Sequence, residues 1–237
     1  MCCRLVAIAH GREAAHGEQA HEKRTMTPRR QIVDEQQGFT LWFTGLSGAG
    51  KSTLAGMIRD RLEGMGRSVE LLDGDEVRTN LSSGLGFSKA DRDANIRRIA
   101  FVAKLLSRNG VVAITAAISP YREVRYEARK EIRNFVEVFV DCPLEVCEQR
   151  DTKGLYKKAR SGEIQQFTGI SDPYEPPAEP EIHLHTDREN PGQDVDLILD
   201  RLAALGHLQR EGVPAGATYT EDEEALVAER LKNLGYL

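Results

Sequence analysis

The sequence predicts an α/β fold in which a mostly parallel sheet lies between helices on both of its faces. Three observations support this prediction. Short apolar runs alternate with stretches of helical periodicity along most of the chain, and glycine, proline or polar residues separate them. A Gly-rich turn joins the first apolar run to the first helical stretch. This alternation is typical of a parallel sheet covered by helices on both sides.

Five apolar segments are predicted to form the strands. The first, Phe39–Thr44, is bounded by glycine on both sides, which is typical of a buried strand. The other four strands are predicted at residues 69–72, 111–115, 135–140 and 181–186. Ligands of such sheets bind at the carboxyl ends of the strands, so we expect the chemistry directly after the first four of them.

The predicted helices lie between these strands. Helical periodicity runs from Lys51 to Leu62 directly after the Gly-rich turn. Residues 89–108 form a longer helix, with Ser88 as its N-cap and Gly110 as its stop. Three more helices are predicted at residues 121–133, 143–150 and 192–205.

Composition divides the chain into three parts. Residues 1–37 are polar and show no sustained period, which predicts a disordered N-terminal tail. Residues 38–208 carry the strand and helix pattern and are predicted to form one domain. Residues 209–237 form a C-terminal extension, in which Glu221–Leu234 has the apolar spacing of an amphipathic helix.

Charge and cysteine content exclude several classes of protein. A formal net charge of −5 over 237 residues argues against a general nucleic-acid binder. No apolar run approaches the length of a membrane span, so no membrane partner is expected. The four cysteines show no repeated spacing, which argues against a disulfide framework or a cysteine zinc site. We therefore expect a cytoplasmic protein.

The Gly-rich turn matches the phosphate-binding pattern G-x-x-x-x-G-K-[ST]. Such a loop directs several backbone N–H groups and a helix N-terminus at a polyphosphate. Lys51 is predicted to reach the outer phosphates, and Ser52 to offer its hydroxyl to Mg²⁺. The turn therefore predicts a P-loop NTPase fold, which GTPases, motors and metabolite kinases share, and we expect Mg-ATP as the ligand. The predicted ATP contacts in this turn are Gly45, Leu46, Ser47, Gly48, Ala49, Gly50, Lys51, Ser52 and Thr53.

Two carboxylates follow the second predicted strand. Asp73 and Asp75 flank one glycine at the expected active edge. One of them is suited to hold Mg²⁺ through water and one to take the proton from an attacking hydroxyl, but the sequence does not divide these roles. Arg78 lies about one helical turn beyond Asp75 and is suited to bind an anionic substrate. The alternative is an Asx turn followed by an exposed arginine.

Longer stretches resemble the adenylylsulfate kinase family over roughly residues 39–206. The resemblance implies transfer of the ATP γ-phosphate to the 3′-hydroxyl of adenosine 5′-phosphosulfate (APS), with 3′-phosphoadenylylsulfate (PAPS) as product. Besides the turn and the segment 72–78, the matching stretches are Leu85-Gly86-Phe87-Ser88, Asp91-Arg92-Asp93-Ala94-Asn95-Ile96-Arg97-Arg98, Ile118-Ser119-Pro120, residues 140–151, residues 153–160, Phe167-Thr168-Gly169-Ile170 and Asp172-Pro173-Tyr174-Glu175.

The resemblance also implies the substrate contacts. Phe87 and Phe167 would hold the adenine ring between them, although both could instead be core aromatics. Anion contacts are implied for Arg78, Arg92 and Lys153, since guanidinium groups match phosphate and sulfate oxygens. Asp73 would hold the metal with Ser52. The other implied substrate contacts are Asp75, Asn95, Ile118, Ser119 and Gln166.

Two further features follow from the resemblance. The basic run Arg150–Arg160 would form a mobile lid over ATP, with Arg150 as an ATP contact, where a plain reading is a solvated charged surface. Ser119 matches the position to which a phosphoserine intermediate has been assigned in the family. We expect direct transfer instead, because the sequence places no base beside Ser119. The resemblance also implies a homodimer, because members of the family are commonly dimers.

Two other functions compete with this one. Another small-molecule P-loop kinase would not need Phe87, Phe167 and the three cationic residues together. A non-catalytic nucleotide-binding regulator predicts damage at Lys51 or the aspartates, all of which are present.

Overall fold

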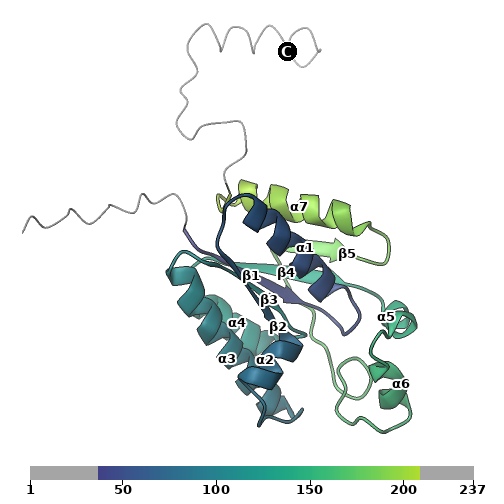
Figure 1. The fold of residues 1–237 in the computed structure, drawn as a ribbon. Helices are drawn as coiled ribbons and strands as arrows, with labels where there is room; N and C mark the ends of the chain where they lie inside the picture. The colour runs from purple at the N-terminus through teal and green to yellow at the C-terminus, as the bar shows by residue number, and fades with distance from the viewer. Residues whose placement is uncertain (1–36, 209–237) are drawn as a thin grey trace, which may run out of the picture. The chain divides into compact units, whose positions relative to one another are not determined.

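A computed structural model describes residues 37–208 of the chain. Its centre is a five-stranded sheet with the strand order β2-β3-β1-β4-β5, and each neighbouring pair is parallel (Figure 1). The predicted α/β fold is therefore confirmed. The strands are β1 (Thr40–Thr44), β2 (Val69–Asp73), β3 (Val112–Ala116), β4 (Phe135–Asp141) and β5 (Ile182–His185).

Helices cover both faces of the sheet. On one face lie α1 (Lys51–Gly64) and α7 (Pro191–Ala204), and on the other lie α3 (Lys89–Arg108) and α4 (Arg122–Glu131) (Figure 1). Three short helices follow strands at the carboxyl edge of the sheet: α2 (Gly74–Asn80) after β2, then α5 (Leu144–Arg150) and α6 (Leu155–Arg160) after β4.

Alternation along β1 builds two hydrophobic cores. Leu41 and Phe43 belong to the core that includes residues of α1 and α7. Trp42 points the other way, into the core formed with α3 and α4, and its ring stacks on Phe135 with the centroids 5.5 Å apart. Successive side chains of a strand point to opposite faces, so burial on both sides explains the continuous apolar run.

The elements predicted from periodicity agree with the structure to within about two residues at each end. Ser88 caps α3 as predicted, and its hydroxyl accepts a hydrogen bond from the Asp91 N–H at 3.2 Å. The helices α2 and α6 were not predicted as elements. They have seven and six residues, and a carboxylate that precedes each helix fixes its first turn. Asp73 accepts from the Asp75 N–H in α2, and Asp151 accepts from the Tyr156 N–H in α6.

Apart from residue 37, the two predicted terminal segments lie outside the described residues, including the predicted helix Glu221–Leu234. Within residues 37–208, no helix combines the length and the apolar character needed to cross a membrane.

Candidate active site

A cavity of about 850 Å³ opens beside the carboxyl ends of β1, β2 and β3. It brings together residues that are more than a hundred positions apart in the sequence. The predicted site residues that line it are Ser47, Gly48, Gly50, Lys51, Ser52, Thr53, Asp73, Asp75, Arg78, Phe87, Arg92, Asn95, Ile118, Ser119, Arg150, Lys153, Gln166 and Phe167. Gly45, Leu46 and Ala49 belong to the same loop but do not line the cavity.

The loop between β1 and α1 requires glycine for steric reasons. Gly45 has φ 150°, and a Cβ there would lie 2.4 Å from the Val140 carbonyl oxygen. Gly50, directly before α1, has φ 102°, in the region that side chains disfavour. The loop therefore passes close to β4 and then turns into α1, whose first-turn N–H groups have no partner within the helix and lie at the cavity.

Lys51 is folded back onto the loop. Its Nζ donates to the carbonyl oxygens of Gly45 at 3.0 Å and of Leu46 at 2.7 Å. Burial lowers the pKa of Lys51 from 10.5 to about 8, since the charged amine is removed from water. The loop thus holds a cation at the place where an anion would bind.

Asp73 lies next to Ser52. The Ser52 hydroxyl donates to Asp73 Oδ2 at 2.7 Å, and the other carboxylate oxygen accepts from the Asp75 N–H at 3.0 Å. Asp73 therefore serves as the N-cap of α2 while its second oxygen faces the loop. A hydroxyl and a carboxylate this close fit Mg²⁺, which binds oxygen atoms and takes most of its ligands from water and phosphates.

Asp75 has different surroundings. Its carboxylate forms an ion pair with Lys153, from the segment between α5 and α6. Both side chains are exposed, and both line the cavity. The structure thus gives the two aspartates different contacts: Asp73 contacts the loop serine, and Asp75 pairs with Lys153 of the basic segment.

Phe87 and Phe167 differ in burial. Phe87 is 52% exposed, and the guanidinium groups of Arg78 and Arg92 lie 4.4 Å and 5.7 Å from its ring centre. Phe167 is 8% exposed and contacts Tyr156 edge-on, with the ring centroids 5.0 Å apart. Phe87 is therefore not a core residue, whereas Phe167 belongs to the core and also lines the cavity.

Arg92 is buried and connects two segments that line the cavity, one with Phe87 and one with Gln166. Its Nε donates to the Phe87 carbonyl oxygen at 2.8 Å, and its Nη2 donates to the Gln166 carbonyl oxygen. Asp172 lies 3.8 Å from the guanidinium. Arg92 thereby holds the segment before α3 against the segment that contains Phe167.

Two predicted site residues at the cavity have a buried polar atom without a hydrogen-bond partner among the described residues. These atoms are Asn95 Oδ1 and Ser119 Oγ. Ser119 has the unusual φ of 46°, and its carbonyl oxygen accepts from Arg125 and, at 3.4 Å, from Thr44. Unpaired buried polar atoms are costly, so these two are suited to pair with a ligand.

Sequence reasoning missed two residues that hold the loop. The Tyr156 hydroxyl donates to the Ser47 carbonyl oxygen at 2.8 Å, and the Thr186 hydroxyl donates to the Ala49 carbonyl oxygen at 2.8 Å. Arg150 Nη2 in turn donates to the Thr186 carbonyl oxygen at 2.6 Å. Thr186 ends the predicted strand 181–186 and directly follows β5 in the structure, and this place at a strand end is the signal that would have found it.

The rest of the basic run is solvated. Lys158 pairs with Glu163 at 3.4 Å, Arg160 pairs with Glu148, and all four side chains are partly or well exposed. Within residues 150–160, the polar contacts described above, to Thr186, Asp75 and the loop, thus come from Arg150, Lys153 and Tyr156.

A parallel sheet with a phosphate-binding loop and an adjoining acceptor cavity defines the chain as a P-loop kinase. Residues 37–185 match the family model described as adenylylsulphate kinase. The chain belongs to this family, which confirms the resemblance seen in the sequence.

Individual relatives agree with this assignment. The chain is 60% identical over 176 residues to an adenylyl-sulfate kinase of Rippkaea orientalis, covering 74% of this chain and 97% of the relative. Among solved structures, the Mycobacterium tuberculosis APS kinase in complex with AMPPNP and APS is 46% identical, with a TM-score of 0.68 over 70% of this chain and 98% of that one. A hexameric APS kinase from Thiobacillus denitrificans is 42% identical, with a TM-score of 0.58 over 74% of this chain and 30% of that one.

Proposed function

We propose that this protein is an adenylylsulfate kinase that transfers the γ-phosphate of ATP to the 3′-hydroxyl of APS and releases PAPS and ADP. The observation that carries the proposal is that an exposed Phe87 and two guanidinium groups line the same cavity as residues of the phosphate loop. An aromatic ring suits adenine, and guanidinium groups suit the phosphosulfate. A homologous kinase has been solved with AMPPNP and APS bound.

The ATP half of the proposal rests on the loop. Its N–H groups and the start of α1 would surround the phosphates, and Lys51 would exchange its two carbonyl partners for phosphate oxygens. Arg150 contacts Thr186 beside the loop, and in this proposal it would also contact the nucleotide.

Ser52 and Asp73 would hold Mg²⁺, Ser52 directly and Asp73 through water. When bound, the ion neutralises charge on the β- and γ-phosphates. Asp73 also keeps α2 in place through its cap, so metal binding and the position of Asp75 depend on the same side chain.

Asp75 would act as the base. The 3′-oxygen attacks the γ-phosphorus, the bond from that phosphorus to the bridging oxygen of ADP breaks, and the hydroxyl proton passes to the Asp75 carboxylate. Lys153, paired with Asp75 before substrate binds, would then turn to the anionic groups of APS. In this scheme, Asn95, Ile118, Ser119 and Gln166 orient the substrate.

Ser119→Ala is expected to lower kcat less than about tenfold, because direct transfer needs no nucleophilic serine. No base contacts Ser119 Oγ within the described residues. Steady-state kinetics with ATP and APS measure this. Loss of nearly all turnover with intact APS binding, or trapping of a phosphorylated Ser119, would favour the intermediate instead.

Phe87→Ala is expected to raise the KM for APS by roughly tenfold, since stacking of one base is worth about 1–3 kcal/mol. The melting temperature should not change, because the ring is 52% exposed. Phe101→Ala is a matched control, since Phe101 is 57% exposed and does not line the cavity. An unchanged KM in Phe87→Ala would remove Phe87 from the substrate site.

A direct assay tests the function itself. The protein is incubated with Mg-ATP and APS, and PAPS is separated from APS by ion-exchange chromatography. Parallel reactions offer a nucleoside or a sugar alcohol as the acceptor. Absence of PAPS at micromolar APS, or faster transfer to another acceptor, would defeat the proposal.

The wider setting is also proposed. PAPS formation places the enzyme in sulfate assimilation, and we propose a cytoplasmic homodimer that needs no membrane or nucleic acid. The hexameric relative makes the number of subunits a question for sedimentation analysis of the full chain.

A further inference from the structure

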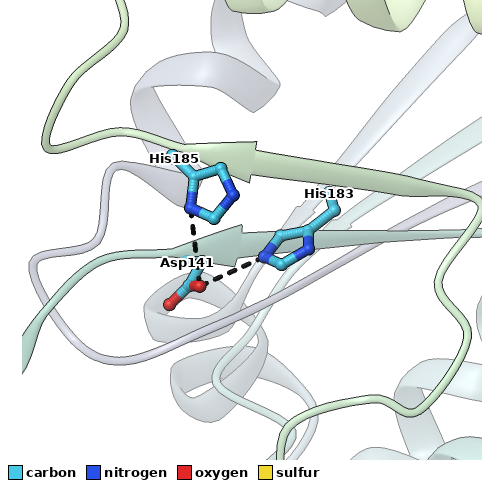
Figure 2. A group of neighbouring side chains, drawn as sticks. All are labelled: Asp141, His183 and His185. Atoms are coloured by element: carbon cyan, nitrogen blue, oxygen red, sulfur yellow. Dashed lines mark hydrogen bonds and ion pairs between the residues drawn. The ribbon is translucent and has the colours of Figure 1, made fainter.

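Two imidazoles and a carboxylate meet at the outer edge of the sheet, apart from the cavity. Asp141 ends β4, and His183 and His185 lie on the neighbouring strand β5 (Figure 2). The parallel register places Asp141 opposite His185. Because the two histidines are two residues apart, their side chains lie on the same face of the strand. None of the three lines the proposed active site.

The distances in this cluster are close to those of a metal site. His183 Nε2 lies 3.1 Å and His185 Nδ1 lies 3.6 Å from the same oxygen, Asp141 Oδ2. One ligand atom from each residue lies within 4.8 Å of the other two. Tetrahedral zinc with bonds of about 2.0–2.1 Å separates its ligand atoms by about 3.3 Å, so small side-chain rotations would suffice.

The surrounding contacts restrain the cluster. The ring of His183 stacks on Phe139 with the centroids 4.8 Å apart, and it lies 4.4 Å from the ring of His185. The backbone N–H of His185 donates to Glu189 at 2.9 Å. The three side chains are still 40–44% exposed, so an ion has access from solvent and water can supply further ligands.

We propose that Asp141, His183 and His185 bind one divalent transition-metal ion of the class of Zn²⁺, Co²⁺ or Ni²⁺. Imidazole nitrogen favours these ions, whereas Mg²⁺ prefers oxygen ligands alone. The site is therefore chemically distinct from the Ser52–Asp73 pair. Three protein ligands leave at least one coordination position for water.

Metal binding here would join the ends of β4 and β5. The Thr186 N–H donates to the Asp141 carbonyl oxygen at 3.2 Å, and the Thr186 hydroxyl holds Ala49 in the phosphate loop. An ion that bridges the two strand ends would hold Thr186 in the position from which it contacts the phosphate loop. We therefore expect the metal ion to raise the melting temperature of the nucleotide-free protein.

The test compares metal binding by four versions of the full chain. These are the wild type, Asp141→Asn, the double variant His183→Asn/His185→Asn, and a tail control in which Cys2 and Cys3 become Ser and His10, His16 and His21 become Asn. Zn²⁺ is titrated calorimetrically into each protein without nucleotide, and Co²⁺ absorption reports the ligand field. Melting is followed with and without Zn²⁺.

The wild type and the tail control are expected to share one site that Mg²⁺ does not displace. The double histidine variant should lose this site and its Zn²⁺-dependent rise in melting temperature, and Asp141→Asn should weaken binding at least about tenfold. PAPS formation and metal-free melting should stay unchanged, which shows that the variants fold. Wild-type affinity and stoichiometry in the double variant, or no saturable binding in the tail control, would overturn the proposal.

Discussion

Lys51→Met is expected to lower kcat for PAPS formation by roughly 10³-fold, the scale seen when one preorganised hydrogen-bond donor is removed from a reacting centre. Lys51 is 8% exposed, and its Nζ donates to two carbonyl oxygens of the loop, so the charge is held where the proposed function expects the phosphates. Methionine keeps most of the volume and removes the charge. Rapid-quench measurement of PAPS at saturating ATP and APS gives the rate.

The same variant should be more stable than the wild type without nucleotide. Burial lowers the pKa of Lys51 in the folded protein to about 8, below its ordinary value of 10.5. The cost of keeping the buried amine charged is fully present below pH 8. It decreases as the pH rises towards 10.5, because only the unfolded state still holds the proton. Urea unfolding should therefore show a gain near neutral pH that shrinks in alkaline buffer.

Lys104→Met is the matched control, because Lys104 forms an exposed pair with Glu131 at 3.2 Å, far from the loop in sequence. It should retain wild-type kcat. A Lys51→Met enzyme that keeps more than about a tenth of the wild-type rate would contradict the role of Lys51 in transfer.

Asp75→Asn is expected to lower kcat by roughly 10³-fold, within the range that a positioned base contributes. The amide cannot take the 3′-hydroxyl proton. The Mg²⁺ requirement of the Asp75→Asn enzyme should match the wild type, since the Asp75 carboxylate contacts Lys153 and not Ser52.

Asp73→Asn should behave differently. It replaces the carboxylate next to the Ser52 hydroxyl with a neutral amide, so the Mg²⁺ concentration needed for half-maximal rate should rise, and high Mg²⁺ should restore part of kcat. Rates measured against Mg²⁺ at fixed ATP and APS separate the two variants. The exchange of these two results would reverse the assigned roles.

A neutral comparison comes from Asp60→Asn. Asp60 is exposed and pairs with its neighbour Arg59 on α1, outside the cavity. Wild-type kinetics in this variant would show that loss of one carboxylate charge has no general effect on the rate.

Much of the fold followed from local patterns. The run from Phe39 to Thr44 predicted β1, because a strand buried on both faces needs apolar side chains on both. Ser88 predicted the start of α3, since an N-cap acts through its own next few residues. The short helices α2 and α6 carry no such pattern. The Asp73 side chain caps α2, and the Asp151 carboxylate accepts from the Tyr156 N–H in the first turn of α6.

The sequence alone determined the phosphate loop from Gly45 to Ser52, because the steric need for glycine and the reach of one lysine are properties of a few consecutive residues. It also supplied the residue set that resembles one kinase family. Only the tertiary structure shows that Asp73 and Asp75 have different contacts, that Phe87 is exposed while Phe167 is buried, and that Asp141 lies next to His183 and His185. Such differences depend on which distant segments meet when strands pair and helices pack, and no local pattern records that.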